Sequence, residues 1–200
     1  MNQASYFFCG IGGSGMLPLA QIAQGLGSSV AGSDRSRDQG RTPDKFAWME
    51  ANGFTLFPQD GSGVTSPDQV LVASAAIEDS VPEVARAREL GCERMSRAEL
   101  LSQMFNAADF SVAVGGTSGK STVTGMIAWI LHEAGHDPTV MNGAVMKNFV
   151  SRSNPFASAA AMWPWNLMNN AQGADAQATS SDAGTKGSSR GTRRRTAADK

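Results

Sequence analysis

A glycine-rich turn between an apolar run and an amphipathic segment is the feature that most restricts how this chain can fold. Residues 5–9 (SYFFC) form a short apolar run, and residues 10–15 (GIGGSG) follow it directly. Apolar side chains then recur at helical spacing as far as Gly27, a residue type that commonly ends helices. A buried strand, a glycine turn and a helix in this order are typical of the first unit of a parallel sheet.

The same alternation continues along the first half of the chain. Further strand candidates are the apolar runs at residues 30–31, 54–57 and 69–73. Helix starts are indicated by Thr42 before Pro43 and by two serine–glutamate pairs spaced as capping boxes, Ser80 with Glu83 and Ser96 with Glu99. This alternation predicts an α/β fold, with a mainly parallel sheet covered by helices on both faces, in a first domain of residues 1–107.

A second unit of the same kind starts near residue 108. Its strand candidate is residues 110–114 (FSVAV), and a second glycine turn follows at residues 116–122 (GTSGKST). Apolar residues at a helical repeat then continue to Gly135, and residues 139–141 are a further strand candidate. We therefore predict the first part of a second domain over residues 108–158.

The first turn fits the pattern GxGxxG, in which absent side chains let backbone amides at a helix N-terminus approach a diphosphate. Asp34 follows the second strand candidate, where a carboxylate commonly accepts a hydrogen bond from a ribose hydroxyl. The pattern indicates a nucleotide without saying which one, so NAD stays possible on this motif alone. The structural alternative is that the glycines serve only close packing of the helix.

The second turn has the composition and the setting of a phosphate-binding loop. Its backbone amides would surround the phosphates of ATP, Lys120 would contact the β and γ phosphates, and the Ser121 hydroxyl would bind Mg²⁺. Val114 occupies the place of the first glycine in the usual pattern, so the loop is a variant form. ATP binding is favoured over a structural turn because the glycines, the lysine, the hydroxyl and both flanking elements agree.

Taken together, the two turns and the residues around them resemble the Mur ligases, the amide-forming ligases of peptidoglycan synthesis, and most closely the members that add alanine. The segments that carry the resemblance are FCGIGGSGM at 8–16, GSD at 32–34, ASAAI at 73–77, GTSGKST at 116–122 and GM at 125–126. The resemblance covers about residues 4–158. It implies a Rossmann-like domain followed by the start of a P-loop ATPase domain. An NAD-linked dehydrogenase, the alternative for the first turn, has no need of the second.

The resemblance also implies the ligands. The UDP part of a UDP-N-acetylmuramate substrate would lie on Gly12, Gly13, Ser14 and Gly15, with Asp34 and Ser74 near the nucleoside. ATP would lie on Gly116, Thr117, Ser118, Gly119, Lys120, Ser121 and Thr122. Lys120 would be the catalytic cation, and Ser121 would hold Mg²⁺.

By the same resemblance, the reaction joins an amino acid, most commonly L-alanine, to the carboxylate of the substrate through an acyl phosphate. ADP and phosphate are released. Ser118 stands where the alanine-adding ligases usually have His, so the amino acid can differ. A non-catalytic nucleotide-binding module that acts through a partner remains the alternative.

The composition changes after about residue 158. Residues 1–150 hold 10 basic and 15 acidic residues, whereas residues 151–200 hold 7 basic and 3 acidic ones. Residues 160–200 contain no Val, Ile, Phe or Tyr, so this segment cannot bury enough apolar surface to offset the entropy of ordering it. We predict a disordered tail over residues 159–200, a frameshift near residues 157–159 as its origin, and a truncated ligase without activity of its own.

Charge and hydropathy exclude two classes of partner. The formal net charge is −1, so no overall field recruits nucleic acid. No apolar run approaches the length of a membrane span, about 18 residues, and the first residues lack the pattern of a leader peptide. The sequence therefore predicts a cytoplasmic protein whose ligands are small molecules.

Overall fold

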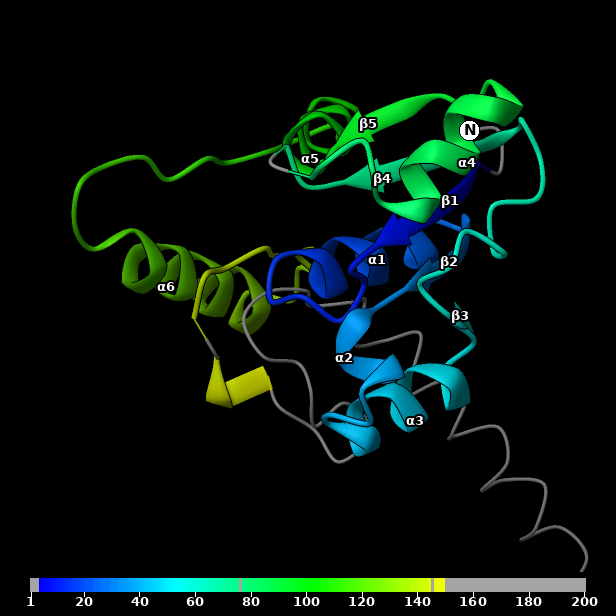
Figure 1. Ribbon diagram of the computed structural model, residues 1–200. Coiled ribbons are helices and arrows are strands. Elements are labelled where there is room, and N and C mark those ends of the chain that lie inside the picture. The colour runs from blue at the N-terminus through cyan, green and yellow to red at the C-terminus, as the bar shows by residue number, and fades with distance from the viewer. Residues whose placement is uncertain (1–3, 76, 145, 150–200) are drawn as a thin grey trace, which may run out of the picture. The chain divides into compact units, whose positions relative to one another are not determined.

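The computed structural model describes residues 4–75, 77–144 and 146–149, and at its centre is a five-stranded parallel sheet. The strands are β1 (Ser5–Cys9), β2 (Ser29–Ser33), β3 (Thr55–Phe57), β4 (Gln69–Ala73) and β5 (Arg94–Ser96). Their order is β3-β2-β1-β4-β5, and every neighbouring pair is parallel. The chain thus builds the sheet first to one side of β1 and then to the other (Figure 1).

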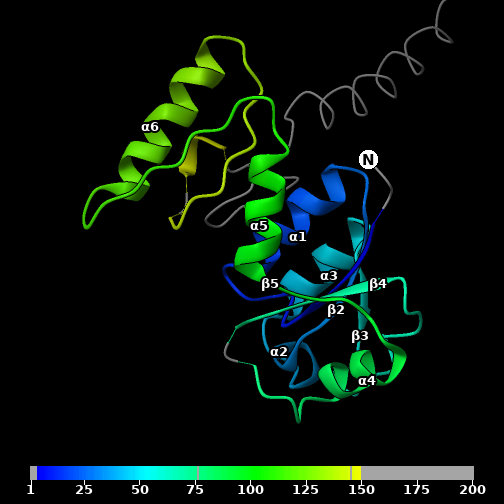
Figure 2. The ribbon, with the colours of Figure 1, turned by 90° about the horizontal axis from the view of Figure 1, so that it is seen from above.

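Helices cover both faces of the sheet because the side chains of each strand alternate between two cores. The helices around the sheet are α1 (Met16–Gly25), α2 (Arg35–Asp38), α3 (Pro43–Ala51), α4 (Pro82–Leu90) and α5 (Arg97–Asn106). Phe8 and Val72 pack with residues of α1, α3 and α5, whereas Phe7 and Leu71 pack with residues of α4. Figure 2 shows α5, α1 and α3 on the same side of the strands. The two cores confirm the predicted α/β architecture.

Most of the predicted helices and strands are present. The predictions were most accurate where they rested on residues close together in the sequence. The capping box of α5 is complete. The Glu99 amide donates to the Ser96 hydroxyl at 3.2 Å, and the Ser96 amide donates to the Glu99 carboxylate at 2.7 Å. The box predicted for Ser80 and Glu83 is wrong, because the Glu83 side chain is buried and accepts a hydrogen bond from the Ser33 hydroxyl of β2. The strand β5 and the short helix α2 were not predicted.

The second unit has its glycine turn and its helix, α6 (Lys120–Glu133), but lacks the two predicted strands. Residues 110–114 are irregular, with Phe110 78% exposed, and residues 139–141 contain only an isolated bridge at Val140. A strand needs a neighbour for its backbone N–H and C=O groups, and the described residues offer none to residues 110–114. Both strand predictions are therefore wrong.

The described part of the chain ends with a short 3-10 helix, η1 (Lys147–Phe149). The tail predicted for residues 159–200 lies outside it, as does the end of the domain predicted for residues 108–158. The division between the two domains stays a prediction. No helix in the described part is long and apolar enough to cross a bilayer.

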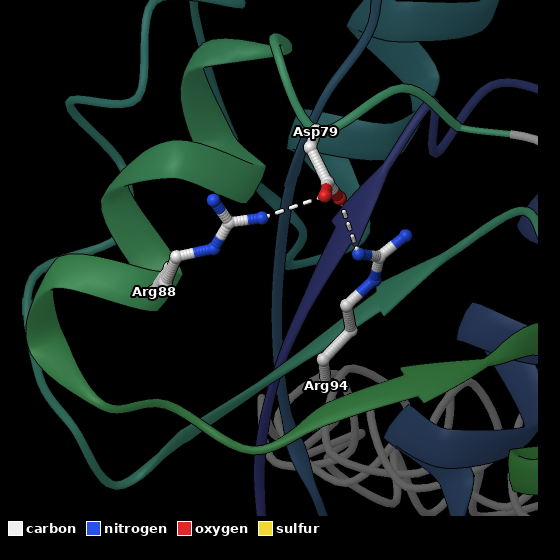
Figure 3. A network of polar contacts seen from close by, with 3 residues as sticks. All are labelled: Asp79, Arg88 and Arg94. Atoms are coloured by element: carbon white, nitrogen blue, oxygen red, sulfur yellow. Dashed lines mark hydrogen bonds and ion pairs between the residues drawn. The ribbon is translucent and has the colours of Figure 1, made fainter.

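An ion-pair network connects the loop after β4 to two neighbouring elements. Asp79 lies in this loop and is bonded to Arg94 of β5 at 2.9 Å and to Arg88 of α4 at 2.7 Å (Figure 3). The hydrogen bonds from Arg94 and Arg88 hold the pKa of the Asp79 carboxyl below its usual value. All three side chains are exposed, so solvent screens the pairs, and the network contributes little to the stability of the fold.

Gly63→Ala is expected to destabilise the fold. A Cβ at Gly63 would overlap the rings of Phe7 and Phe57, which pack in the core beside α4. Overpacking of this kind costs about 1–3 kcal/mol of unfolding free energy. Gly115→Ala is the control, because nothing lies within 4 Å of its Cβ position. Urea unfolding compares the two variants, and an unchanged midpoint for Gly63→Ala would contradict this packing.

Candidate functional site

The first glycine turn lies where the order of the sheet reverses. β1 has β2 on one side and β4 on the other, so the carboxyl ends of three adjacent strands meet beside residues 10–15. Asp34 directly follows β2, and the exposed Ser74 directly follows β4. Ligands of open parallel sheets bind in the crevice at such a switch point. The topology thus brings to one edge all the residues that were predicted to hold the UDP substrate.

Hydrogen bonds from the end of β2 hold the turn in shape. The Ser33 carbonyl oxygen accepts the Gly10 amide at 2.8 Å. The Asp34 carboxylate accepts the Gly12 amide through Oδ2 and the Ser36 amide through Oδ1, both at 2.8 Å. Asp34 is only 7% exposed, so both bonds are largely shielded from water. Its carboxylate therefore orders the turn, a role that the glycine pattern alone did not indicate.

A buried carboxyl group lies behind this connection. Glu83, in the first turn of α4, is fully buried, and its Oε1 accepts a hydrogen bond of 2.6 Å from the Ser33 hydroxyl. Its Oε2 has no hydrogen-bond partner within the described ranges. Burial, and after it repulsion from Glu83, raises the pKa of the Cys9 thiol to about 11. This thiol is therefore not a nucleophile at neutral pH.

Two backbone amides of the turn remain available to a ligand. The amides of Gly12 and Gly13 are bonded within the protein, at 2.8 and 3.0 Å. Those of Ser14 and Gly15 have no acceptor among the described residues. Both amides precede α1, whose N-terminal end carries a partial positive charge. The turn therefore presents two N–H donors to an anion.

Two basic side chains reach this turn from neighbouring helices. Lys45 of α3 donates from Nζ to the Gly12 carbonyl oxygen at 2.8 Å. Arg97 of α5 lies so close to Gly15 that a Cβ added there would overlap its Nη1. Neither residue belongs to a motif in the sequence, and only the fold brings them beside residues 10–15.

The second glycine turn forms the N-terminal end of α6. Gly119, directly before the helix, has a φ of 78°, a conformation that favours glycine. Lys120 folds back over the turn, where Nζ donates to the carbonyl oxygens of Gly116 at 2.8 Å and Thr117 at 3.4 Å. Ser118 and Thr122 are exposed, and Ser121 is half-buried. The lysine charge therefore already lies at the backbone that was predicted to surround the phosphates of ATP.

Asn142 contacts the residue that was predicted to bind Mg²⁺, and the sequence did not single it out. Its Nδ2 donates to the Ser121 carbonyl oxygen at 3.0 Å, and the residue is 6% exposed. Its Oδ1 has no hydrogen-bond partner in the part of the chain that the structure describes. The side chain that bonds the Ser121 backbone therefore carries a buried, unpaired amide oxygen, and Mg²⁺ prefers oxygen donors of this kind.

Comparisons with known proteins agree with this arrangement. Residues 5–109 match the model of the Mur ligase family, catalytic domain. A UDP-N-acetylmuramate-L-alanine ligase of Agathobacter rectalis is 35% identical over 168 residues, which cover 81% of this chain and 36% of that protein. The chain belongs to the Mur ligase family. This assignment confirms the resemblance that rested on the two glycine turns.

Solved Mur ligases share the fold of this member of the family. The UDP-N-acetylmuramate-alanine ligase of Thermotoga maritima superposes with a TM-score of 0.62 at 25% identity, covering 78% of this chain and 34% of that one. The UDP-N-acetylmuramate:L-alanyl-gamma-D-glutamyl-meso-diaminopimelate ligase of Neisseria meningitides gives 0.62 at 28% identity, covering 74% and 45%. The chain spans about a third of the length of the curated relatives it matches.

Asp34→Ala is expected to lower the free energy of unfolding by about 2 kcal/mol, because it removes the charged acceptor of two backbone amides. Asp34→Asn keeps one oxygen acceptor and should lose less. Asp44→Ala, at an exposed carboxylate of α3, is the control and should change stability by less than about 0.5 kcal/mol. Urea unfolding gives the free energies. Hydrogen exchange should show faster exchange of the Gly12 amide in the Asp34 variants but not in Asp44→Ala. Equal exchange rates in all variants would show that Asp34 does not hold the turn.

Proposed function

We propose that this chain carries the UDP-substrate site and the ATP site of a Mur-type ligase, which joins an amino acid to the carboxylate of UDP-N-acetylmuramate. One observation carries the proposal: a member of the Mur ligase family has two glycine turns, each at the N-terminal end of a helix. The first turn has unpaired amides that suit a diphosphate. The second has the lysine and the hydroxyls that hold ATP and its metal ion.

The UDP part of the substrate would lie on Gly12, Gly13, Ser14 and Gly15. The amides of Ser14 and Gly15 would donate to diphosphate oxygens, and the glycines would let the ligand approach the backbone. Asp34 and Ser74, at the ends of β2 and β4, would lie beside the nucleoside. The relative from Agathobacter rectalis has UDP-N-acetylmuramate in its name, which supports this choice of ligand.

The second turn would support phosphoryl transfer. An oxygen of the substrate carboxylate attacks the γ-phosphorus of ATP, and ADP leaves. The amine of the amino acid then attacks the carbonyl carbon of the acyl phosphate, loses a proton and releases inorganic phosphate. Lys120 would stabilise the transferring group once its Nζ exchanges the carbonyl oxygens of Gly116 and Thr117 for phosphate oxygens.

The residues around α6 fit a magnesium ion. The Ser121 hydroxyl would hold it, with Thr122 next in the chain and the unpaired Asn142 Oδ1 as a further oxygen donor. When bound, Mg²⁺ neutralises charge on the phosphates. The exposed amides of Thr117, Ser118 and Gly119 would complete the site around them.

The 200 residues correspond to about a third of the length of the related ligases, and the two nucleotide sites are the part of the reaction that we propose for them. L-alanine is the amino acid that the relatives' names favour. With ATP and a UDP-linked sugar as its ligands, the protein would act in the cytoplasm.

Lys120→Ala is expected to weaken Mg-ATP binding by about tenfold or more, the loss of a charge-assisted contact to phosphate. UDP binding should persist, because the first turn is built from separate elements. Lys147→Ala, a lysine of η1, is the matched control and should leave both ligands unaffected. Calorimetric titration measures the affinities. Equal loss of ATP and UDP in Lys120→Ala would contradict two independent sites.

Gly12→Val is expected to abolish UDP binding, because a Cβ there would lie 2.9 Å from Asp34 Oδ2 and from the Phe46 ring. The wild-type chain should bind UDP and ATP but not NAD in the same titration. Gly115→Val, at a position with open space, is the control. Unchanged UDP affinity in Gly12→Val would show that the site is misplaced. Binding of ATP alone would favour a non-catalytic module, and binding of NAD a dehydrogenase.

A further inference from the structure

We infer that Lys45 and Arg97 form a cationic clamp that recognises the charge of the diphosphate at the first glycine turn. The inference rests on the proposed function for the identity of the nucleotide. It goes further by assigning charge recognition to two side chains outside the glycine pattern. Each comes from a different helix, and each lies at a different end of the turn.

Arg97 occupies the Gly15 end of the turn. It is the first residue of α5, and a Cβ built on Gly15 would overlap its Nη1 and lie 3.1 Å from its Cζ. Among the described residues Arg97 has no hydrogen bond and no ion pair, whereas Arg88 and Arg94 are both paired with Asp79. The five N–H donors of a guanidinium are therefore unused beside the unpaired amides of Ser14 and Gly15.

Lys45 occupies the Gly12 end. Its Nζ donates to the Gly12 carbonyl oxygen at 2.8 Å, and the side chain is half-buried. An ammonium group has three N–H donors, and this carbonyl is its only acceptor among the described residues. The bond holds the charge at the turn and leaves donors for ligand oxygens.

The topology explains why the two cations approach from opposite sides. α3 follows β2 and α5 follows β5, and these strands lie on opposite sides of β1 in the sheet. α3, α1 and α5 pack on one face of the sheet, with α1 between the other two (Figure 2). A ligand at the N-terminal end of α1 would therefore have a basic side chain on each flank.

The charge of the site makes the clamp necessary. The Asp34 carboxylate lies 2.8 Å from the Gly12 amide and is almost fully buried, so it would repel a diphosphate bound at the same turn. Two unpaired amides supply only partial positive charge. Lys45 and Arg97 offset the repulsion, and the resulting site takes two linked phosphate groups in preference to one.

Calorimetric titration of the full 200-residue chain with UDP and with UMP tests the clamp. Arg97→Ala and Lys45→Ala are each expected to weaken UDP binding about 10- to 100-fold, because each variant loses a charge-assisted hydrogen bond to the diphosphate. The loss should be smaller for UMP, which has one phosphate. Arg94→Ala is the matched control, because Arg94 is an exposed arginine of the preceding strand that is paired with Asp79. Its UDP affinity should equal that of the wild type, and thermal unfolding should show that all variants fold.

A double-mutant cycle isolates the geometry at Gly15. Gly15→Ala should displace the guanidinium, so Gly15→Ala and the double variant with Arg97→Ala should bind UDP equally weakly. Additive losses would overturn the placement of Arg97. Unchanged UDP affinity in Arg97→Ala, or an equal loss in Arg94→Ala, would overturn the clamp while leaving the proposed function intact. A folded wild-type chain that binds no UDP would overturn both.

Discussion

The hydrogen bond from the Gly12 amide to the buried Asp34 carboxylate is the contact on which the first site depends. It joins the turn after β1 to the residue after β2, and the Ser33 carbonyl adds a second connection through the Gly10 amide. Because these amides are bonded within the protein, the turn has a fixed shape before any ligand arrives. Only the amides that face α1 remain for an anion. Such preorganisation lowers the entropy lost on binding.

The same edge of the sheet concentrates carboxyl groups beneath the proposed anion site. Asp34 is nearly buried, and Glu83 is fully buried with one oxygen unpaired among the described residues. Burying polar groups without partners costs stability, so this arrangement is one that packing alone would not favour. The basic side chains of Lys45 and Arg97 supply the compensating charge from α3 and α5. Order in the turn and the proposed affinity for a diphosphate thus depend on different residues.

The sequence predicted local features well and long-range ones poorly. The capping box of Ser96 and Glu99 was predictable because its partners are three residues apart in the chain. Glu83 has the same spacing from Ser80, yet its side chain bonds Ser33, fifty residues away in sequence. Residues 110–114 have the composition of a strand but no neighbour to pair with in the described structure. The composition of a segment indicates whether it tends to form a strand, but the fold decides whether a neighbouring strand is there to pair with it.

The sequence by itself determined the alternation of strands and helices, the parallel α/β architecture, both glycine turns and the membership of the Mur ligase family. The first three follow from periodicity and spacing within single segments, which are local properties, and the family membership follows from the resemblance of short motifs to those of the Mur ligases. Only the tertiary structure decided which donors of the first turn stay unpaired, that Asp34 orders the turn, and that Lys45, Arg97 and Asn142 adjoin the two sites. Such contacts join residues far apart in the chain, and no local pattern records them, because strand order and helix packing alone set their distances.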